Sequence, residues 1–73
     1  MRRIIDLETL YEWAREQCEQ SGLSIWIGED TKTKDIMLNV QGEYAIISPD
    51  CWLHDVQWLF EETIKLAKEK QRR

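Results

Sequence analysis

Apolar residues alternate with other residues along two short runs, at about residues 35–40 and 43–48, and this alternation predicts two β-strands. Gln41-Gly42 between them is a reasonable two-residue hairpin loop. A loop of that length predicts three cross-strand pairs on one face: Val40 with Glu43, Leu38 with Ala45, and Ile36 with Ile47. A loop one residue longer or shorter would exchange the two faces, so the register stays open on the sequence alone.

Two further elements are expected before this hairpin. A helix over about residues 7–21 has Asp6 as a suitable N-cap and Gly22 as a left-handed C-cap. A first strand over about residues 23–27 alternates cleanly, and a polar turn over residues 28–34 follows it. These two elements place a helix and a strand ahead of the hairpin.

A second helix is predicted over about residues 49–70, followed by a basic tail over residues 71–73. Ser48 suits the N-cap position, and Pro49 suits the first helical position. The apolar residues of this helix share one broad face: Trp52, Leu53, Val56, Leu59, Phe60, Ile64 and Ala67. We therefore expect this helix to supply much of the core.

The order α-β-β-β-α predicts an α+β fold, a three-stranded antiparallel meander packed with two helices, in a single small domain over residues 1–73. The sequence does not decide whether the helices lie on one or both faces of the sheet. Many small proteins share this order, including some phage-encoded inhibitors of host defence, and order and size alone identify no family.

The second face of the predicted sheet is also apolar, and two short helices cannot easily cover both faces. A chain of 73 residues contains four tryptophans, a residue type enriched among the residues that carry binding energy in interfaces. We therefore predict a non-enzymatic protein-interaction module that self-associates or binds a protein partner. The predicted interface is Trp26, Met37, Tyr44, Ile46, Trp58 and Trp13.

The charge balance of 14 acidic and 10 basic residues argues against a general nucleic-acid-binding protein, which would need a basic face. A row of carboxylates at helical spacing, Glu8, Glu12, Glu16 and Glu19, favours an alternative function. Such a row can imitate duplex phosphates, as in a small acidic inhibitor of phage type that occupies a basic nucleic-acid-binding enzyme. An ordinary solvated helix face is the interpretation we favour, since a net charge of −4 is mild for a phosphate mimic.

Cys51 and His54 lie three residues apart in what is predicted as the first turn of the second helix. The helix dipole there would favour a thiolate, so a thiol-dependent activity at Cys51 is a further alternative. Zinc would need three or four ligands, and the chain has a single histidine. We expect an incidental surface pair, with no catalytic, metal-binding or cofactor-binding residues.

Two cysteines, Cys18 and Cys51, are too few for a disulfide scaffold, and the first residues lack the apolar run of a signal peptide. No run of residues is apolar enough to predict a membrane span. The expected setting is therefore the reducing cytoplasm.

Overall fold

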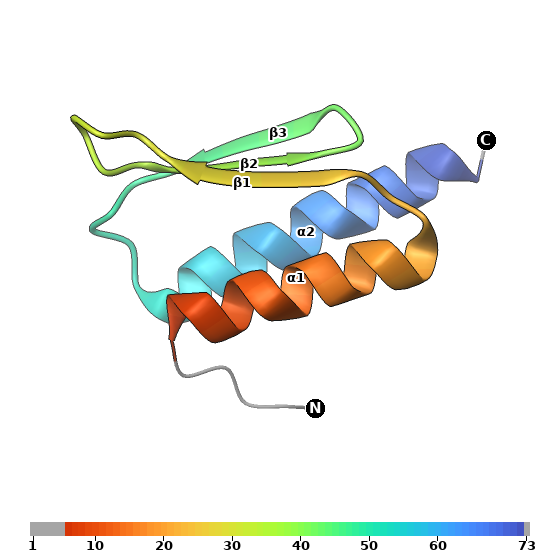
Figure 1. Cartoon of the computed structure of the whole chain (residues 1–73), viewed down its shortest axis with the longest axis horizontal. Helices are drawn as coiled ribbons and strands as arrows, with labels where there is room; N and C mark the ends of the chain where they lie inside the picture. The colour runs from red at the N-terminus through yellow and green to blue at the C-terminus, as the bar shows by residue number, and fades with distance from the viewer. Residues whose placement is uncertain (1–5, 73) are drawn as a thin grey trace.

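The structure, a computed structural model, describes residues 6–72 and has two layers, a sheet and a pair of helices (Figure 1). Its elements in chain order are α1 (Leu7–Ser21), β1 (Ile25–Glu29), β2 (Ile36–Val40), β3 (Glu43–Ile47) and α2 (Leu53–Gln71). The antiparallel strands lie in the order β1-β2-β3. The predicted α+β meander is confirmed, and the open question of the helices is answered, because both lie on the same face of the sheet.

The hairpin of β2 and β3 has the register that a two-residue loop predicts. Gln41 and Gly42 both have positive φ angles, 52° and 90°, as the type I′ turn between twisted strands requires. The Asn39 side chain supports the turn, because its Oδ1 accepts a hydrogen bond from the Gly42 N–H at 3.0 Å. The three predicted pairs are all present: Val40 with Glu43, Leu38 with Ala45, and Ile36 with Ile47.

Both predicted caps of α1 are confirmed. The Asp6 carboxylate accepts a hydrogen bond from the Thr9 N–H at 2.7 Å, which satisfies a free donor of the first turn. Gly22 ends the helix in the left-handed conformation with φ 69°. The N–H of Leu23 donates to the Cys18 carbonyl at 2.8 Å, so the chain is still part of the helix cap at this residue.

The predicted start and end of the first strand were each two residues too early. β1 begins at Ile25 because Leu23 belongs to the α1 cap, and it continues through Gly28 and Glu29, which pair with β2. The polar turn is shorter than predicted, because Gly28 and Glu29 are strand residues. Asp30 organises this turn, since its Oδ1 accepts hydrogen bonds from the N–H groups of Lys32 and Thr33 at 2.7 and 3.0 Å.

The predicted start of the second helix was wrong by four residues. Ser48 does not cap α2. Its carbonyl accepts from the Cys51 N–H at 3.2 Å and its hydroxyl from the Asp50 N–H at 3.3 Å, which closes a separate turn. Trp52 is the extended residue at the N-cap position and makes no side-chain cap bond. At the other end Gln71 closes the helix and Arg72 follows it, while Arg73 of the predicted tail lies outside the described residues.

The core lies between the helices and the inner face of the sheet, the face that α1 and α2 cover. Its buried residues come from both helices, from β2 and β3, and from the α1 cap: Leu10, Ala14, Cys18, Leu23, Ile36, Leu38, Val40, Ile47, Val56, Phe60, Ile64 and Ala67. From β1, Ile25 and Ile27 are partly buried against them. Tyr11 stacks on Phe60 with ring centroids 5.9 Å apart, which joins the two helices. Thr63 is buried among these residues because its hydroxyl donates to the Leu59 carbonyl at 2.8 Å.

Candidate protein interface

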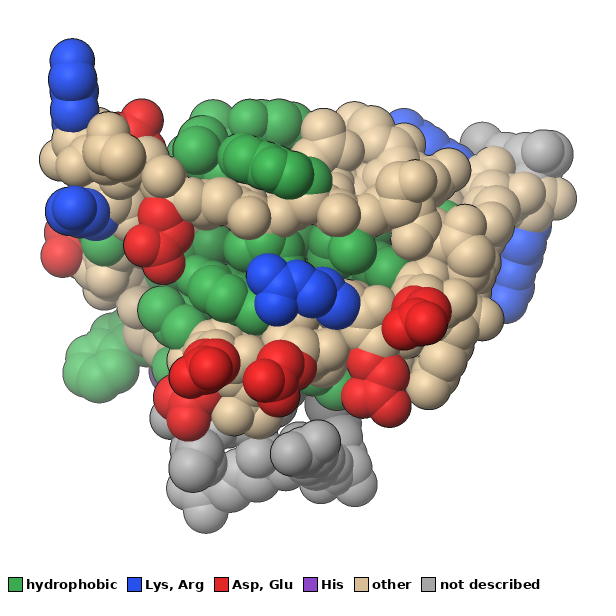
Figure 2. Space-filling model, viewed as in Figure 1, with side chains coloured by type: hydrophobic (Ala, Val, Ile, Leu, Met, Phe, Trp, Pro, Cys, Tyr) green, Lys and Arg blue, Asp and Glu red, His purple; other side chains and the backbone are tan. Residues whose placement is uncertain are grey.

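The outer face of the sheet, the one that no helix covers, presents four apolar side chains from its three strands. Trp26 is 53% exposed, Tyr44 56% and Ile46 63%, while Met37 between them is half-buried. The pairing brings Met37 opposite Ile46 and places Trp26 and Tyr44 on either side of Asn39. Figure 2 shows apolar side chains gathered along the top of the molecule, over this side of the sheet. The four predicted sheet residues therefore form one continuous surface.

The indole of Trp26 lies along β1, over the backbone of Gly28. A Cβ atom at Gly28 would stand 2.5 Å from Cη2 and 2.7 Å from Cζ2 of that ring, closer than nonbonded atoms approach. The glycine therefore gives the ring a flat place to lie against the strand. This contact holds the Trp26 indole ring on the outer face while leaving about half of the side chain exposed.

The outer face carries no charged strand position. Its remaining members are Gly28 and Asn39, and the Asn39 Oδ1 is occupied by the turn at Gly42. Although 33% of the residues of the chain are charged, none of the outer positions of the three described strands is. An uncharged apolar surface of this kind is typical of the central part of a protein interface.

Two residues of the predicted interface lie elsewhere. Trp13 of α1 is half-buried beside Gln17, in a groove between the helices that Ile64 also lines. Trp58 of α2 is exposed, on the helical layer. Since both helices cover the inner face, neither tryptophan joins Trp26 on the outer face.

Trp52 was predicted in the core and is 74% exposed, which corrects that prediction. The reason is the late start of α2. Trp52 precedes the first helical residue, so the helical spacing that placed it on the apolar face does not apply to it.

The predicted helical position of Cys51 and His54 is also wrong for Cys51. Cys51 lies in the turn before α2, outside its first turn, while His54 is the second residue of the helix. The His54 Nε2 lies 3.4 Å from the Asp55 carboxylate and both groups are exposed. Cys18 is fully buried, and this burial raises the pKa of its thiol. Within residues 6–72 no three His, Cys, Asp or Glu side chains gather as metal ligands would.

The acidic row of α1 is exposed along its whole length, at Glu8, Glu12, Glu16 and Glu19. Figure 2 shows acidic side chains along this helix, below the sheet. The row lies on the helical layer, away from the outer face of the sheet. Arg15 interrupts the row, as expected for a solvated helix face.

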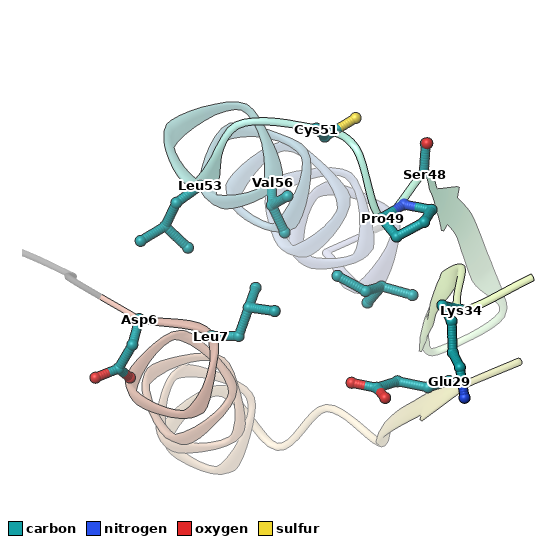
Figure 3. A pocket seen from close by; sticks show the side chains of 10 residues that line it. Asp6, Leu7, Glu29, Lys34, Ser48, Pro49, Cys51, Leu53 and Val56 are labelled. Carbon is teal, nitrogen blue, oxygen red and sulfur yellow. The ribbon is translucent and has the colours of Figure 1, made fainter. Parts of the chain in front are cut away.

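A cavity of about 420 Å³ opens at the end of the molecule where the two helices begin (Figure 3). Leu7, Leu53 and Val56 point into it, whereas Cys51 points away. Its carboxylates are already engaged, because Asp6 caps α1 and Glu29 accepts from the Tyr11 hydroxyl at 3.4 Å. The cavity thus offers aliphatic walls but few free polar groups to orient a ligand.

Sequence reasoning did not find this cavity, because its lining comes from five separate segments. It also missed the contact of Trp26 with Gly28, although a glycine two residues beyond a tryptophan on the same strand face was a usable signal.

In the described part of the chain no helix has the length and apolarity needed to cross a membrane. Comparison of the chain with protein-family models, curated proteins and solved structures found no match.

Proposed function

We propose that this chain is a non-enzymatic protein-interaction module whose contact surface is the outer face of the sheet. The observation that carries the proposal is the exposure of Trp26, Tyr44 and Ile46 on a face whose strand positions carry no charge. A contiguous exposed apolar surface of this kind is typical of an interaction site. The partner is a protein, either a second copy of the chain or another one.

The energetic case rests on the area that a partner would cover. Burying about 500 Å² of apolar surface contributes on the order of 12 kcal/mol before the entropy of association is subtracted. Trp26 and Tyr44 supply much of that area, and tryptophan and tyrosine are the residue types most often found to dominate binding energy. This gain is of the same order as the cost of association, roughly 4–15 kcal/mol, so burial of this face is the term that decides whether a partner stays bound.

Site-specific photo-crosslinking in the native cell tests this function. A benzophenone amino acid replaces Trp26 on the outer face, and in a matched control it replaces Trp52, an aromatic residue more exposed but off this face. We expect a discrete protein adduct from position 26 and only diffuse products from position 52. Equal products from both positions, or none from position 26, would contradict the proposal.

A competition control makes the result specific. Excess unlabelled chain should compete the adduct at position 26 away, and excess chain carrying Trp26→Ser should compete less well. Tyr44→Ser, at the opposite side of the same face, should weaken competition in the same way. A Trp52→Ser competitor should match the unchanged chain.

A further inference from the structure

The open edge of β3 has free backbone groups whose direction the hydrogen bonds determine. The Gln41 N–H donates to the Ser24 carbonyl at 3.0 Å. The backbone groups of residue 41, which follows β2, therefore point toward β1. Backbone groups alternate in direction along a strand, so Val40 bonds toward β3 and pairs with Glu43. On β3, the N–H and C=O groups of Tyr44 and Ile46 therefore point away from the sheet, toward solvent.

Two β3 edges fit each other in antiparallel orientation about a two-fold axis at Ala45. Tyr44 of one copy then stands opposite Ile46 of the other, and each such pair exchanges two N–H···O=C bonds. The two pairs together use all the outward groups of Tyr44 and Ile46 on both copies. Ala45 meets Ala45 of the second copy, where a small side chain suits the close approach of a non-hydrogen-bonded pair. The Gln41-Gly42 turn and Pro49 bound the paired segment.

Apolar side chains border this edge on both layers. On the outer face Tyr44 would pack across the two-fold axis on Ile46 of the second copy, an aromatic and β-branched pair of the kind that stabilises sheets. On the helical layer Leu66 is 46% exposed and Leu59 is half-buried. Both leucines lie on the flank of α2 that carries Lys70, whose ammonium contacts the Glu43 carboxylate of β3.

The other open edge, β1, is a poor site for a second copy. α1 lies on the β1 side of the helical layer, as the Tyr11 to Glu29 hydrogen bond shows, and α1 carries the acidic row (Figure 1). Pairing two β1 edges would bring two acidic rows together, and like charges at an interface are unfavourable. The flank of α2 beside β3 mixes both signs, with Glu62 and Lys70. Charge therefore selects β3.

We propose that β3 pairs with β3 of a second copy of this chain, which joins two three-stranded sheets into one six-stranded sheet with a doubled outer face. The inference rests on the proposed function, because Tyr44 and Ile46 belong to the outer face. The exposed parts of Tyr44, Ile46 and Leu66 amount to roughly 300 Å² per copy, below the roughly 800 Å² per partner of a standard interface. The dimer should therefore dissociate in the micromolar range.

Backbone N-methylation tests the pairing without changing a side chain. A synthetic chain with N-methyl-Ile46 loses an outward N–H of β3, and the matched control with N-methyl-Ile27 loses an outward N–H of β1. Sedimentation equilibrium across the micromolar range should show a dissociation constant about 100-fold higher for N-methyl-Ile46 than for the unmodified chain. N-methyl-Ile27 should leave the constant unchanged. A wild-type monomer throughout, or equal constants for both modified chains, would overturn the inference.

A cysteine at the proposed two-fold axis provides a positive signal. In a Cys51→Ser background, Ala45→Cys should oxidise to a covalent dimer of twice 8.8 kDa, because non-hydrogen-bonded partners lie at disulfide distance. Thr31→Cys in the same background places a thiol in the β1–β2 turn, at a position more exposed than the half-buried Ala45, and should crosslink only by collision. Equal dimer yields from the two variants would contradict pairing at β3.

Failure of this inference and failure of the proposed function give different results. If position 26 crosslinks to a protein while N-methyl-Ile46 has no effect, the outer face is the contact surface and the pairing of β3 is wrong. If N-methyl-Ile46 dissociates a dimer while position 26 yields no adduct, the pairing of β3 holds, and the proposal that the outer face around Trp26 is the contact surface is wrong.

Discussion

Ile46 and Ile47 are neighbours on β3 with the same side chain and opposite surroundings. Ile47 is 1% exposed against the helices, while Ile46 is 63% exposed on the outer face. The fold needs the buried Ile47, whereas the exposed Ile46 has no role within the fold itself. The comparison extends to the whole sheet, whose inner face is covered by both helices while its outer face still carries four large apolar side chains, Trp26, Met37, Tyr44 and Ile46. We propose a partner because this apolar surface stays exposed to solvent after the chain has folded.

The largest effect should separate these two isoleucines. Ile47→Ala removes buried methyl and methylene groups and leaves a cavity, so the free energy of unfolding should fall by about 3 kcal/mol. Ile46→Ala should change it by less than about 0.5 kcal/mol, because the side chain is mostly in water. Urea denaturation at a concentration where the chain is monomeric measures both. Similar losses would mean that the outer face also belongs to the core.

The cap of α1, one of the two helices covering the inner face, should respond to acid. The Thr9 N–H bonded to its carboxylate lowers the pKa of Asp6 below the usual value for an aspartate. A carboxyl with a lowered folded pKa stabilises the fold above its unfolded pKa, and this stabilisation is lost as the pH falls through the folded value. Wild-type stability should therefore drop in acid below about pH 4.

Asp6→Asn is the matched control, because asparagine also caps a helix but does not titrate there. Its melting temperature should fall less steeply with acid than that of the wild type. The pKa of Asp30 is lowered in the same way by the N–H groups of Thr33 and Lys32, so adding Asp30→Asn should flatten the profile further. Parallel profiles for all three chains would contradict the capping account.

A smaller effect is expected on the outer face itself. Gly28→Ala places a Cβ where the Trp26 ring lies, and the ring can swing away because it is the end of a side chain. Unfolding free energy should change by less than about 1 kcal/mol, while the NMR signal of the Trp26 indole N–H should shift. An unmoved indole signal would contradict the packing of Trp26 on Gly28. A much larger loss of stability would show that the contact of the Trp26 ring with Gly28 stabilises the fold.

The smallest effect should come from Trp52. Trp52→Ala removes a large side chain that is exposed before the start of α2, so stability should stay within about 0.5 kcal/mol of the wild type. Thermal unfolding measures it. A loss of stability as large as that of a core substitution would instead support the sequence-based placement of Trp52 among the buried apolar residues of the helix.

Local patterns in the sequence predicted much of the fold. Asp6 and Gly22 marked both ends of α1. The sequence left the register of the hairpin open, and the structure has the register that a two-residue loop at Gln41-Gly42 predicts. Ser48-Pro49 misled, because a serine followed by proline suits both a helix start and a tight turn, and the hydrogen bonds at Ser48 chose the turn. Periodicity alone could not have made that choice.

The candidate site was only partly predictable. Alternation placed Trp26, Met37, Tyr44 and Ile46 on one face, and the structure keeps them together. Helical spacing could say that Trp13 and Trp58 lie off the main apolar stripes, but not that both helices share the inner face. That depends on how the layers stack, which a one-dimensional pattern does not contain. The apolar border of β3 at Leu59 and Leu66 depends on the same stacking.

Sedimentation of the wild type beside Ile46→Lys tests most directly whether the outer face is a contact surface in this chain. Ile46 is mostly exposed, so lysine should leave the circular dichroism spectrum and the melting curve of the monomer unchanged. We expect the wild type to sediment above its monomer mass of 8.8 kDa at micromolar concentration and Ile46→Lys to sediment as the monomer. A folded Ile46→Lys chain that associates as strongly as the wild type would contradict it.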